Sequence, residues 1–360
     1  MTVKPIAFSP ETASSVIHIS EDASFSMGND LKTFSRALLF RDQKVDSAWG
    51  ASIQKIFEAG EIQFSEVVLD AGESLKDQQG LTRILEHMAA ADLDRDSCVI
   101  AAGGGSLGDV VGFAASIWNR GVPWIAVPTT LLAMVDAHLG GKTAIQYGGI
   151  KNRIGSFHLP EKVWVEPALL KSLPITELRQ GWAELIKSAV IGGGELLDSL
   201  QAGIPKNLIP DLQQLKNAMT VKVDVVNGDM YEAGQRRVLN LGHTLGHALE
   251  MESIEGQRDW GHGEAVSMGM VFAGHIADQC GISDEPMRPL ISSLLQRVGL
   301  PLRPDPLPDP NRLLDRIECD KKSRSGVVSW VLPKKPGHMI IREFDRQEVQ
   351  ELLSSWATQE

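Results

Sequence analysis

Cysteine is scarce in this chain of 360 residues. Its three cysteines, Cys98, Cys280 and Cys319, lie far apart and form no C-x-x-C pair. This argues against a disulfide framework and fits a protein of the reducing cytoplasm. The chain also lacks a run of about 18 apolar residues, so we expect no membrane-spanning segment. The opening MTVKPIAFSPETASS has no basic stretch followed by an apolar run, and we expect no signal peptide.

Positive charge is also in short supply. The chain has 35 Lys and Arg against 46 Asp and Glu, a formal net charge of −11, and no long Lys/Arg run. This balance disfavours nucleic acid and anionic membranes as partners. A small anionic substrate would need a local basic pocket set against the overall charge. We find no internal repeat and no low-complexity tract.

The first half of the chain alternates short apolar runs with helical segments. This alternation predicts a mostly parallel sheet with helices on both faces, whose ligands sit at the carboxyl ends of the strands. The predicted helices cover residues 77–91 and 108–118. The predicted strands are SVIHIS (15–20), ALLFRD (37–42), SEVVLDAG (65–72), SCVIAAGGG (97–105) and PWIAVPTT (123–130).

After about Pro167 the pattern becomes mainly helical. The proline-rich segment 300–310 reads as a loop, and a short β piece, VVSWVLP followed by HMIIREF, is expected after it. We place the boundary between the two parts near residue 165. The predicted helices of the second part cover residues 175–191, 208–226, 236–250, 263–280 and 287–299.

The stretch AAGGGSLGDVVGFAA follows a predicted strand and opens a helix. Its glycines let backbone approach a ligand, and a helix N-terminus offers free N–H groups to a pyrophosphate. A tight turn that packs the helix on the sheet explains the same glycines. Asp109, in the first helical turn, fits either a favourable interaction with the helix dipole or a contact to cofactor hydroxyls.

A second glycine-rich segment, residues 127–160 with GGKTAIQYGGIKN at its centre, carries Asp136, Lys142, Lys151 and Asn152 at its polar positions. Polar residues in such a loop are commonly ligand contacts, although a surface loop with solvated lysines would have the same composition.

RRVLNLGHTLGHALE predicts one helix with Arg236, Asn240, His243 and His247 on a single face. A surface stripe is usually rich in Glu and Lys, so this composition favours the wall of a site. His243 and His247 have the i, i+4 spacing of a metal-binding pair. His262 and Glu184 are further candidate ligands, and spacing alone does not choose among the four or exclude core histidines.

Several motifs occur together in a fixed order: AGESLK, GGGSLGD, RGVPWIAVPTTLL, VDAHLGGKT, KNRIGSF, AELIK, EAGQRRVLNLGHTLGHALE, HGEAV and DKK. In these the chain resembles the sugar phosphate cyclases, and most closely the 3-dehydroquinate synthases. The resemblance implies a Rossmann-like NAD-binding α/β domain (1–165) and a helical metal- and substrate-binding domain (166–360). The active site would lie in the cleft between them.

The resemblance also implies roles for individual residues. Zinc, or cobalt, would be held by Glu184, His243 and His262. Arg120 would reach the phosphate site of a neighbouring subunit, which implies a homodimer. The other substrate contacts would be Asp136, Lys142, Asn152, Lys187, Lys222, Arg236, Asn240, His247 and one of Lys321 or Lys322, here taken as Lys322. Glu232 also matches a family site position. NAD would contact Asp42, Glu73, Lys76, Gly104, Gly105, Asp109, Thr129, Thr130 and Lys151.

The family reaction oxidises a substrate hydroxyl transiently with NAD, eliminates phosphate, returns the hydride and closes a carbocycle. Two features bear on which sugar phosphate is used. The segment Gln146–Ile150 and Thr176 depart from the usual dehydroquinate synthase residues, and the GG-x-KNR form is more like the 2-epi-5-epi-valiolone synthases, which use sedoheptulose 7-phosphate. Against this, Asn240 is retained where the valiolone-type enzymes commonly replace it, and the retained Arg236 and Lys222 favour a substrate with a carboxylate. A metal-dependent NAD alcohol dehydrogenase and a non-catalytic NAD-binding protein are two further hypotheses for the same residues.

Overall fold

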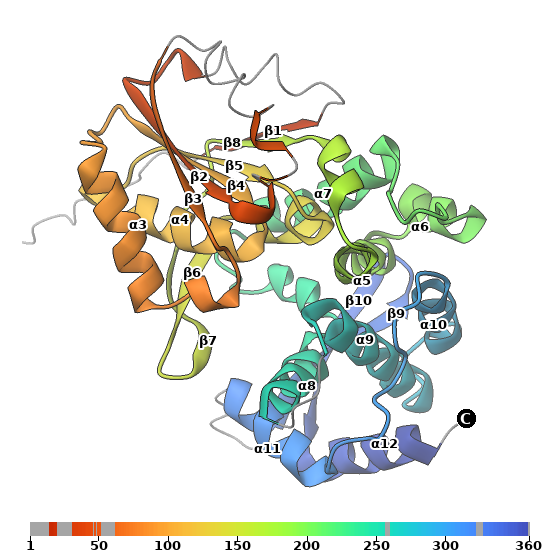
Figure 1. The fold of residues 1–360 in the computed structure, drawn as a ribbon. Helices are drawn as coiled ribbons and strands as arrows, with labels where there is room; N and C mark the ends of the chain where they lie inside the picture. Colours follow the sequence, from red (N-terminus) through yellow and green to blue (C-terminus); the bar gives the residue numbers. More distant parts are fainter. Residues whose placement is uncertain are drawn as a thin grey trace, which may run out of the picture.

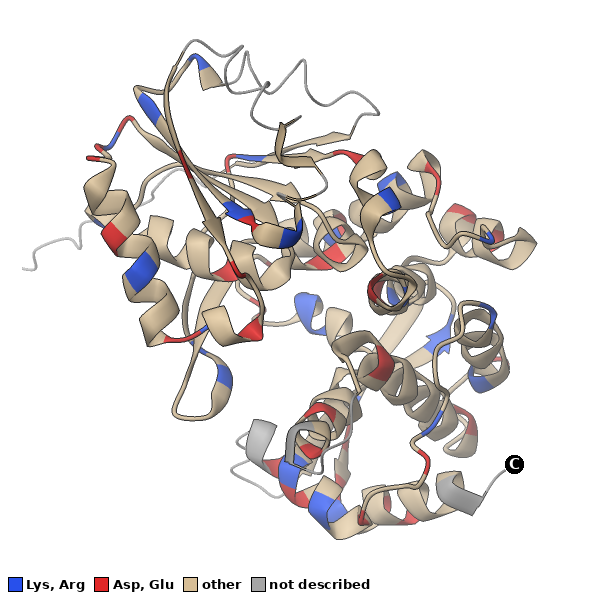
Figure 2. Cartoon of the chain, viewed as in Figure 1, with Lys and Arg blue, Asp and Glu red and all other residues tan. Residues whose placement is uncertain are grey.

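The computed structural model describes residues 14–19, 31–45, 47, 49–51, 62–255, 260–321 and 327–358. Within these residues the first half of the chain forms an α/β layer with a parallel sheet, and the second half is mainly helical (Figure 1). This confirms the predicted fold class. No helix in these ranges is long and apolar enough to cross a bilayer. Acidic and basic residues are interspersed over both halves of the ribbon (Figure 2).

Six strands form one sheet in which each neighbouring pair is parallel, in the order β1-β8-β5-β4-β2-β3. Strands β4 and β5 are buried at every residue, which explains their unbroken apolar runs. The five predicted strands are present, but the sequence pattern does not predict β8, because its apolar run is very short. The strands are β1 (Val16–Ile19), β2 (Arg36–Asp42), β3 (Gln63–Leu69), β4 (Cys98–Gly103), β5 (Trp124–Pro128) and β8 (Lys162–Val165).

The order of the strands changes direction at β2. Strand β3 follows β2 along the chain and pairs on one side of it, whereas β4 pairs on the other side. In open α/β sheets such a point leaves a crevice at the carboxyl ends of the two strands, where ligands bind. Strand β2 ends at Asp42 and β4 ends at Gly103, so the glycine-rich stretch opens onto this crevice.

Helix α4 (Gly105–Ile117) begins at Gly105, earlier than the Gly108 that the sequence pattern predicts. Glycine is a poor helix former, so the pattern underestimates a helix that starts in a glycine run. A Cβ at position 108 would lie 2.0 Å from Nε2 of His138. Glycine there lets the π-helical turn η3 (Ala133–Ala137) and His138 pack against α4. Helix α3 (Gln78–Ala90) lies beside α4.

The segment predicted as a glycine-rich loop contains an antiparallel hairpin of β6 (Lys142–Tyr147) and β7 (Ile150–Phe157). Gly148 and Gly149 at its turn have φ values of 60° and 77°. Two consecutive positive φ values are what a tight hairpin turn requires, and they explain the glycine pair. The sequence pattern misses the hairpin because β7 is almost wholly exposed and has no alternation of buried and exposed residues.

The helical half is arranged around α9, whose residues 265–277 are all buried. Helices α5, α8 and α10 and strand β9 pack against α9. The predicted proline-rich loop and the antiparallel strands β9 (Val327–Lys335) and β10 (His338–Asp345) are confirmed. The helices of this half are α5 (Ile175–Gly192), α6 (Gly194–Ala202), α7 (Leu212–Gly228), α8 (His243–Glu255), α9 (His262–Gln279), α10 (Met287–Arg297), α11 (Pro310–Lys321) and α12 (Arg346–Thr358).

The prediction of one continuous helix from Arg236 to Glu250 is wrong. A 3-10 helix, η5 (Gln235–Asn240), ends before Gly242, and α8 begins at His243. Gly242 has a φ of 80°, which breaks the helix, and a Cβ there would lie 2.8 Å from the carbonyl oxygen of Val266. The break therefore lets the start of α8 approach α9 closely.

Candidate functional site

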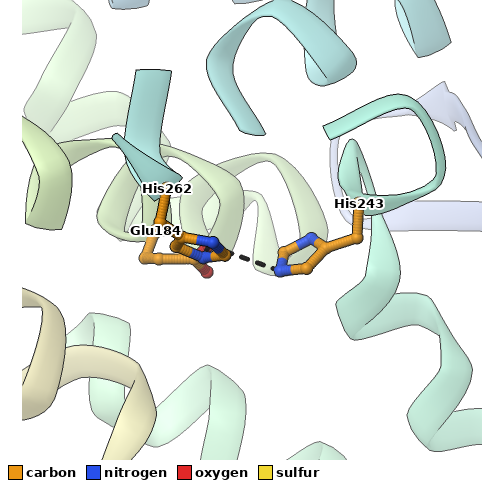
Figure 3. A group of neighbouring side chains, drawn as sticks. All are labelled: Glu184, His243 and His262. Carbon is orange, nitrogen blue, oxygen red and sulfur yellow. Dashed lines mark ion pairs between the residues drawn. The ribbon is translucent and has the colours of Figure 1, made fainter. Parts of the chain in front are cut away.

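Glu184 of α5, His243 at the start of α8 and His262 at the start of α9 form one group, here called the metal cluster. One ligand atom from each lies within 4.8 Å of the other two. Oε1 of Glu184 is 3.3 Å from Nε2 of His262 and 3.6 Å from Nε2 of His243. The three side chains point toward one another from three separate helices (Figure 3). The structure thus singles out these three from the four candidate ligands of the spacing argument.

The metal cluster fits a divalent cation such as zinc. Both carboxylate oxygens of Glu184 are buried: Oε2 pairs with Lys187, whereas Oε1 faces the two histidines and accepts no hydrogen bond from the described residues. Nδ1 of His243 is 3.1 Å from the carbonyl oxygen of Leu241 and can donate to it, which leaves Nε2 directed at the cluster. Zinc-binding histidines commonly have this arrangement, and one carboxylate with two imidazoles is a known catalytic zinc donor set.

Burial and neighbouring charges shift the pKa values of all three residues of the metal cluster, lowering two and raising one. Burial raises the pKa of Glu184, but Lys187 and the two histidines outweigh it and hold that pKa well below its usual range. Burial, and then the charge of Lys187, lower the pKa of His243 to about 3, so its ring is in the neutral form that binds metals. Burial opposes the charge of His262, but Glu184 and Glu250 raise its pKa to about 10.

Gln180 of α5 positions the first turn of α9, which carries His262. Oε1 of Gln180 accepts hydrogen bonds from two backbone N–H groups of that turn, those of Gly263 and, over 3.3 Å, Glu264. A Cβ at Gly261 or Gly263 would lie 2.4 Å from atoms of Gln180, so both must be glycine for this contact. Gln180 lies one helical turn before Glu184. The same face of α5 therefore carries the ligand Glu184 and the side chain that caps the N-terminus of α9, where His262 lies.

Two buried lysines surround Asp136 next to the metal cluster. Nζ of Lys222 is 2.7 Å from Oδ1 of Asp136, and Nζ of Lys187 is 3.7 Å from the same atom. Lys187 also forms an ion pair with Glu184. Burial raises the pKa of Asp136, but Lys222 and Lys187 outweigh it, so the pKa is lowered and the carboxylate stays charged. Four of the predicted site residues are therefore joined in one buried ionic network.

A second group of predicted residues meets at Glu232. Lys142 forms an ion pair with Glu232, and Nδ2 of Asn240 donates to Oε1 of Glu232 over 2.8 Å. Arg236 is buried, and its guanidinium donates to the carbonyl oxygens of Met230 and, over 2.9 Å, Gly140. These contacts place a fixed cation at the wall of the site, as the residue types predict.

His247 lies beside the metal cluster and outside it. Its ring is T-shaped against that of His243, with the ring centroids 5.4 Å apart. The group of residues that could hold a metal contains His243 and not His247.

Residues predicted to contact NAD gather at the carboxyl ends of β2, β4 and β5, here called the cofactor edge. Asp42, Gly104 and Thr129 each stand at or just after the end of one of these strands. A Cβ at Gly104 would lie 3.3 Å from Cγ2 of Thr130, so these two segments touch. Gly105 begins α4, and Ser106 beside it donates to Glu73 over 2.7 Å. The strand order thus brings together residues far apart in the sequence.

Lys76 links the cofactor edge to the substrate residues. Its Nζ donates to Oδ2 of Asp109 over 2.7 Å and to Oδ1 of Asn152 over 2.8 Å. Burial raises the pKa of Asp109 to about 6, although Lys76 draws it down. Lys151, the neighbour of Asn152, donates to Glu250 of α8 over 3.0 Å and in this structure is directed toward the helical half.

Two predicted residues are not part of this assembly. Arg120 is exposed at the end of η2 (Trp118–Arg120), beyond the far end of α4. A helix rises about 1.5 Å per residue, so Arg120 lies roughly 20 Å from the N-terminus of α4 at the cofactor edge. This position does not serve the site of its own chain. Lys322 lies outside the described residues.

The sequence interpretation missed three residues that shape the site. Gln180 lies in none of the motifs, and His138 lies in VDAHLGGKT but was not singled out there, because capping and packing contacts depend on the tertiary structure. Glu250 could have been found, since it follows His243 by seven residues and therefore lies on the same face of α8.

Two family models match the chain in succession. The model of the 3-dehydroquinate synthase N-terminal part matches residues 66–180, and that of the C-terminal part matches residues 181–323. A 3-dehydroquinate synthase from Crocosphaera subtropica is 38% identical over 350 residues, 94% of this chain and 95% of that relative. Another from Symbiobacterium thermophilum is 40% identical over 311 residues, 85% of this chain and 86% of that relative.

The fold has solved counterparts. The structure of 2-epi-5-epi-valiolone synthase from Streptomyces hygroscopicus subsp. jinggangensis, with NAD+ and Zn2+ bound, matches with a TM-score of 0.85 at 26% identity. The match covers 98% of this chain and 99% of that chain. The family models together cover residues 66–323, which include the metal cluster and all of the cofactor edge except Asp42 at the end of β2. The chain belongs to the 3-dehydroquinate synthase family.

Proposed function

We propose that this protein converts 3-deoxy-D-arabino-heptulosonate 7-phosphate into 3-dehydroquinate and phosphate, with NAD restored at the end of each turnover. The observation that carries this proposal is the ionic network in which Lys187 pairs with both Glu184 of the metal cluster and Asp136, which also holds Lys222. A metal site next to buried cations suits a substrate that carries both hydroxyls and negative charge. When bound, NAD+ supplies a reversible hydride acceptor and zinc supplies Lewis-acid polarisation of a substrate oxygen.

The cations of the network orient the substrate. Arg236 is fixed by two backbone carbonyls, so its remaining N–H groups are preorganised to bind a carboxylate as a fork. Lys187 and Lys222 both pair with Oδ1 of Asp136, and they can bind hydroxyl or carboxylate oxygens while Asp136 balances their charge. Holding these groups before the substrate arrives reduces the reorganisation that the reaction requires.

Lys142, Asn152 and His247 are proposed to bind the substrate phosphate. Glu232 holds Lys142, and Lys76 holds the amide oxygen of Asn152, so the Nδ2 group of Asn152 is left to donate to a phosphate oxygen. Asn240, held by Glu232, is proposed to contact a substrate hydroxyl. Lys322 would complete the phosphate site, as the family resemblance implies.

NAD is proposed to lie along the cofactor edge, with its pyrophosphate at the N-terminus of α4. The backbone of Gly104 and Gly105 can approach the pyrophosphate closely, and the free N–H groups of the helix end favour its charge. Asp42, Glu73, Lys76, Asp109, Thr129, Thr130 and Lys151 are the other proposed contacts. We propose that this α/β unit and the helical unit act as two domains divided near residue 165.

A homodimer in the cytoplasm is proposed as the working state. Arg120 is exposed far from its own site, which is the placement needed for a residue that serves a neighbouring subunit. Mixing an R120A variant with a K142A variant tests this arrangement. If the two sites share residues across the interface, the mixture recovers part of the activity that each variant lacks, whereas a monomer recovers none.

The deciding experiment offers two sugar phosphates to the zinc-loaded protein with catalytic NAD+. Phosphate release from 3-deoxy-D-arabino-heptulosonate 7-phosphate without accumulation of NADH is the expected result. Release only from sedoheptulose 7-phosphate would favour the second candidate, a 2-epi-5-epi-valiolone synthase type of cyclase. The atypical segment Gln146–Ile150 is the observation in favour of that candidate. Accumulation of NADH without phosphate release would instead indicate an alcohol dehydrogenase.

A further inference from the structure

Glu250 is a buried carboxylate of α8 that the proposed reaction does not use. Its side chain is only 9% exposed. Oε2 of Glu250 is 3.4 Å from Nδ1 of His262, and Oε1 is 3.0 Å from Nζ of Lys151. A buried carboxylate between a metal-ligand histidine and a lysine of the other half of the molecule calls for an explanation beyond packing.

The contact with His262 determines which nitrogen of that ring is available to a metal. Nε2 of His262 faces Glu184 over 3.3 Å, while Nδ1 faces Glu250. A carboxylate at Nδ1 keeps the hydrogen on that atom, so the lone pair of Nε2 is directed at the metal and the ring is held in place. His243 is oriented in the same way by a backbone carbonyl, that of Leu241.

The contact with Lys151 connects the β6–β7 hairpin to the same carboxylate. The side chain of Lys151 is 41% exposed, and ion pairs that reach solvent contribute little to stability. The side chain of His262 is less exposed, at 30%, so solvent screens its contact with Glu250 less than it screens the contact with Lys151.

We infer that Glu250 is a positioning residue for the metal cluster. Glu250 holds the ring of His262 through Nδ1 and thereby tightens the binding of the metal. This inference rests on the proposed zinc centre. It assigns the strength of metal binding to a residue that does not touch the metal, on the same face of α8 as His243.

Glu252 provides a matched control. It lies two residues further along α8, is 8% exposed, and pairs with Arg312 over 3.1 Å and with Arg316. Two residues along a helix correspond to a rotation of about 200°, so its carboxylate points away from the metal cluster. A substitution at 252 removes the same charge at the same depth without altering the contact at His262.

The test is the zinc dissociation constant, measured by competition with a chelator, together with the visible absorption spectrum of the cobalt-substituted protein. E250A is expected to weaken zinc binding by roughly 10- to 100-fold, the usual cost of losing such a partner, and to change the cobalt spectrum. E250Q keeps an acceptor oxygen and should recover part of the zinc affinity. E252A and K151A should bind zinc with a dissociation constant close to that of wild type. Thermal unfolding of the metal-free proteins shows whether each variant is folded, and E250Q carries the test if E250A is not.

Several results would overturn the inference. They are a folded E250Q or E250A that binds zinc as tightly as wild type, or an E252A or K151A that weakens zinc binding as much as E250A. The outcome is separable from that of the proposed function, because zinc binding is measured without substrate. Weakened zinc binding in a protein that turns over neither sugar phosphate would leave the inference standing and refute the proposed function. A wild-type protein that binds no zinc would refute both.

Discussion

The cofactor edge and the metal cluster are built in opposite ways. At the cofactor edge, Asp42, Gly104 and Thr129 stand at or just after strand ends, and glycines occupy the turn between β4 and α4. The metal cluster takes one side chain from each of α5, α8 and α9, and the packing of these helices holds them together. The first region should therefore be sensitive to added side-chain atoms, and the second to lost ones.

The largest effect is expected from removing a ligand of the metal cluster. H243A should abolish stoichiometric zinc binding and lower the rate of phosphate release by at least about 1,000-fold, since Lewis-acid stabilisation is worth several kcal/mol. NAD binding, measured by calorimetry, should be retained, because the cofactor edge is built separately. H338A, at an exposed histidine of β10, is the control. Full zinc content and activity in H243A would refute the assignment of the metal cluster.

The next effect comes from adding one methyl group behind the cofactor edge. In G108A the new Cβ would collide with the ring of His138, and overpacking a closed interior should lower the free energy of unfolding by about 3 kcal/mol. G72A, where no atom lies within 4 Å of the added Cβ, should change it by less than about 0.5 kcal/mol. Urea denaturation measures both. Equal stability of the two variants would show that α4 does not pack as described.

His138 also predicts a dependence of stability on pH. Burial lowers its pKa to about 4 from the value of 6.5 expected in the unfolded chain. Between these pH values the unfolded state binds a proton that the folded state does not. The contribution of His138 to the free energy of unfolding is therefore complete above pH 6.5 and falls as the pH drops. The loss between pH 7 and pH 5 should be about 2 kcal/mol. H138Q should remove this part of the pH dependence in urea denaturation, and an unchanged dependence would contradict the prediction.

The smallest effect concerns the link between the cofactor edge and the proposed phosphate site. K76M removes the cation that joins Asp109 to Asn152, and charge-assisted hydrogen bonds of this kind are worth about 1.5 kcal/mol or more. NAD affinity should therefore fall by about tenfold while zinc content stays the same. K171M, at an exposed lysine of η4 (Pro167–Ser172), should leave both unchanged. A loss of zinc in K76M would show that the two regions are not independently built.

The cofactor edge is easier to predict from the sequence than the metal cluster, because it is built from local strand–turn–helix units. Strand ends and glycine runs are local signals, so the sequence places Asp42, Gly104 and Thr129 at one edge once the strands are recognised. The metal cluster needed the family resemblance, because spacing alone left His247 as a candidate alongside His243. The continuous helix predicted from Arg236 was wrong, since nothing local in the sequence shows that Gly242 must adopt a positive φ to let α8 meet α9.

Periodicity and residue identity along the chain were enough to predict the fold class, the chemical types of the site residues and the order of the motifs that define the family. These are properties of neighbours in the sequence. The pairings inside the site came only from the folded chain: Lys187 and Lys222 share Asp136, Lys76 reaches Asn152, and Glu250 faces His262. Such pairings depend on how separate helices and strands pack, because the field at a buried charge comes from whichever elements surround it and not from its sequence neighbours.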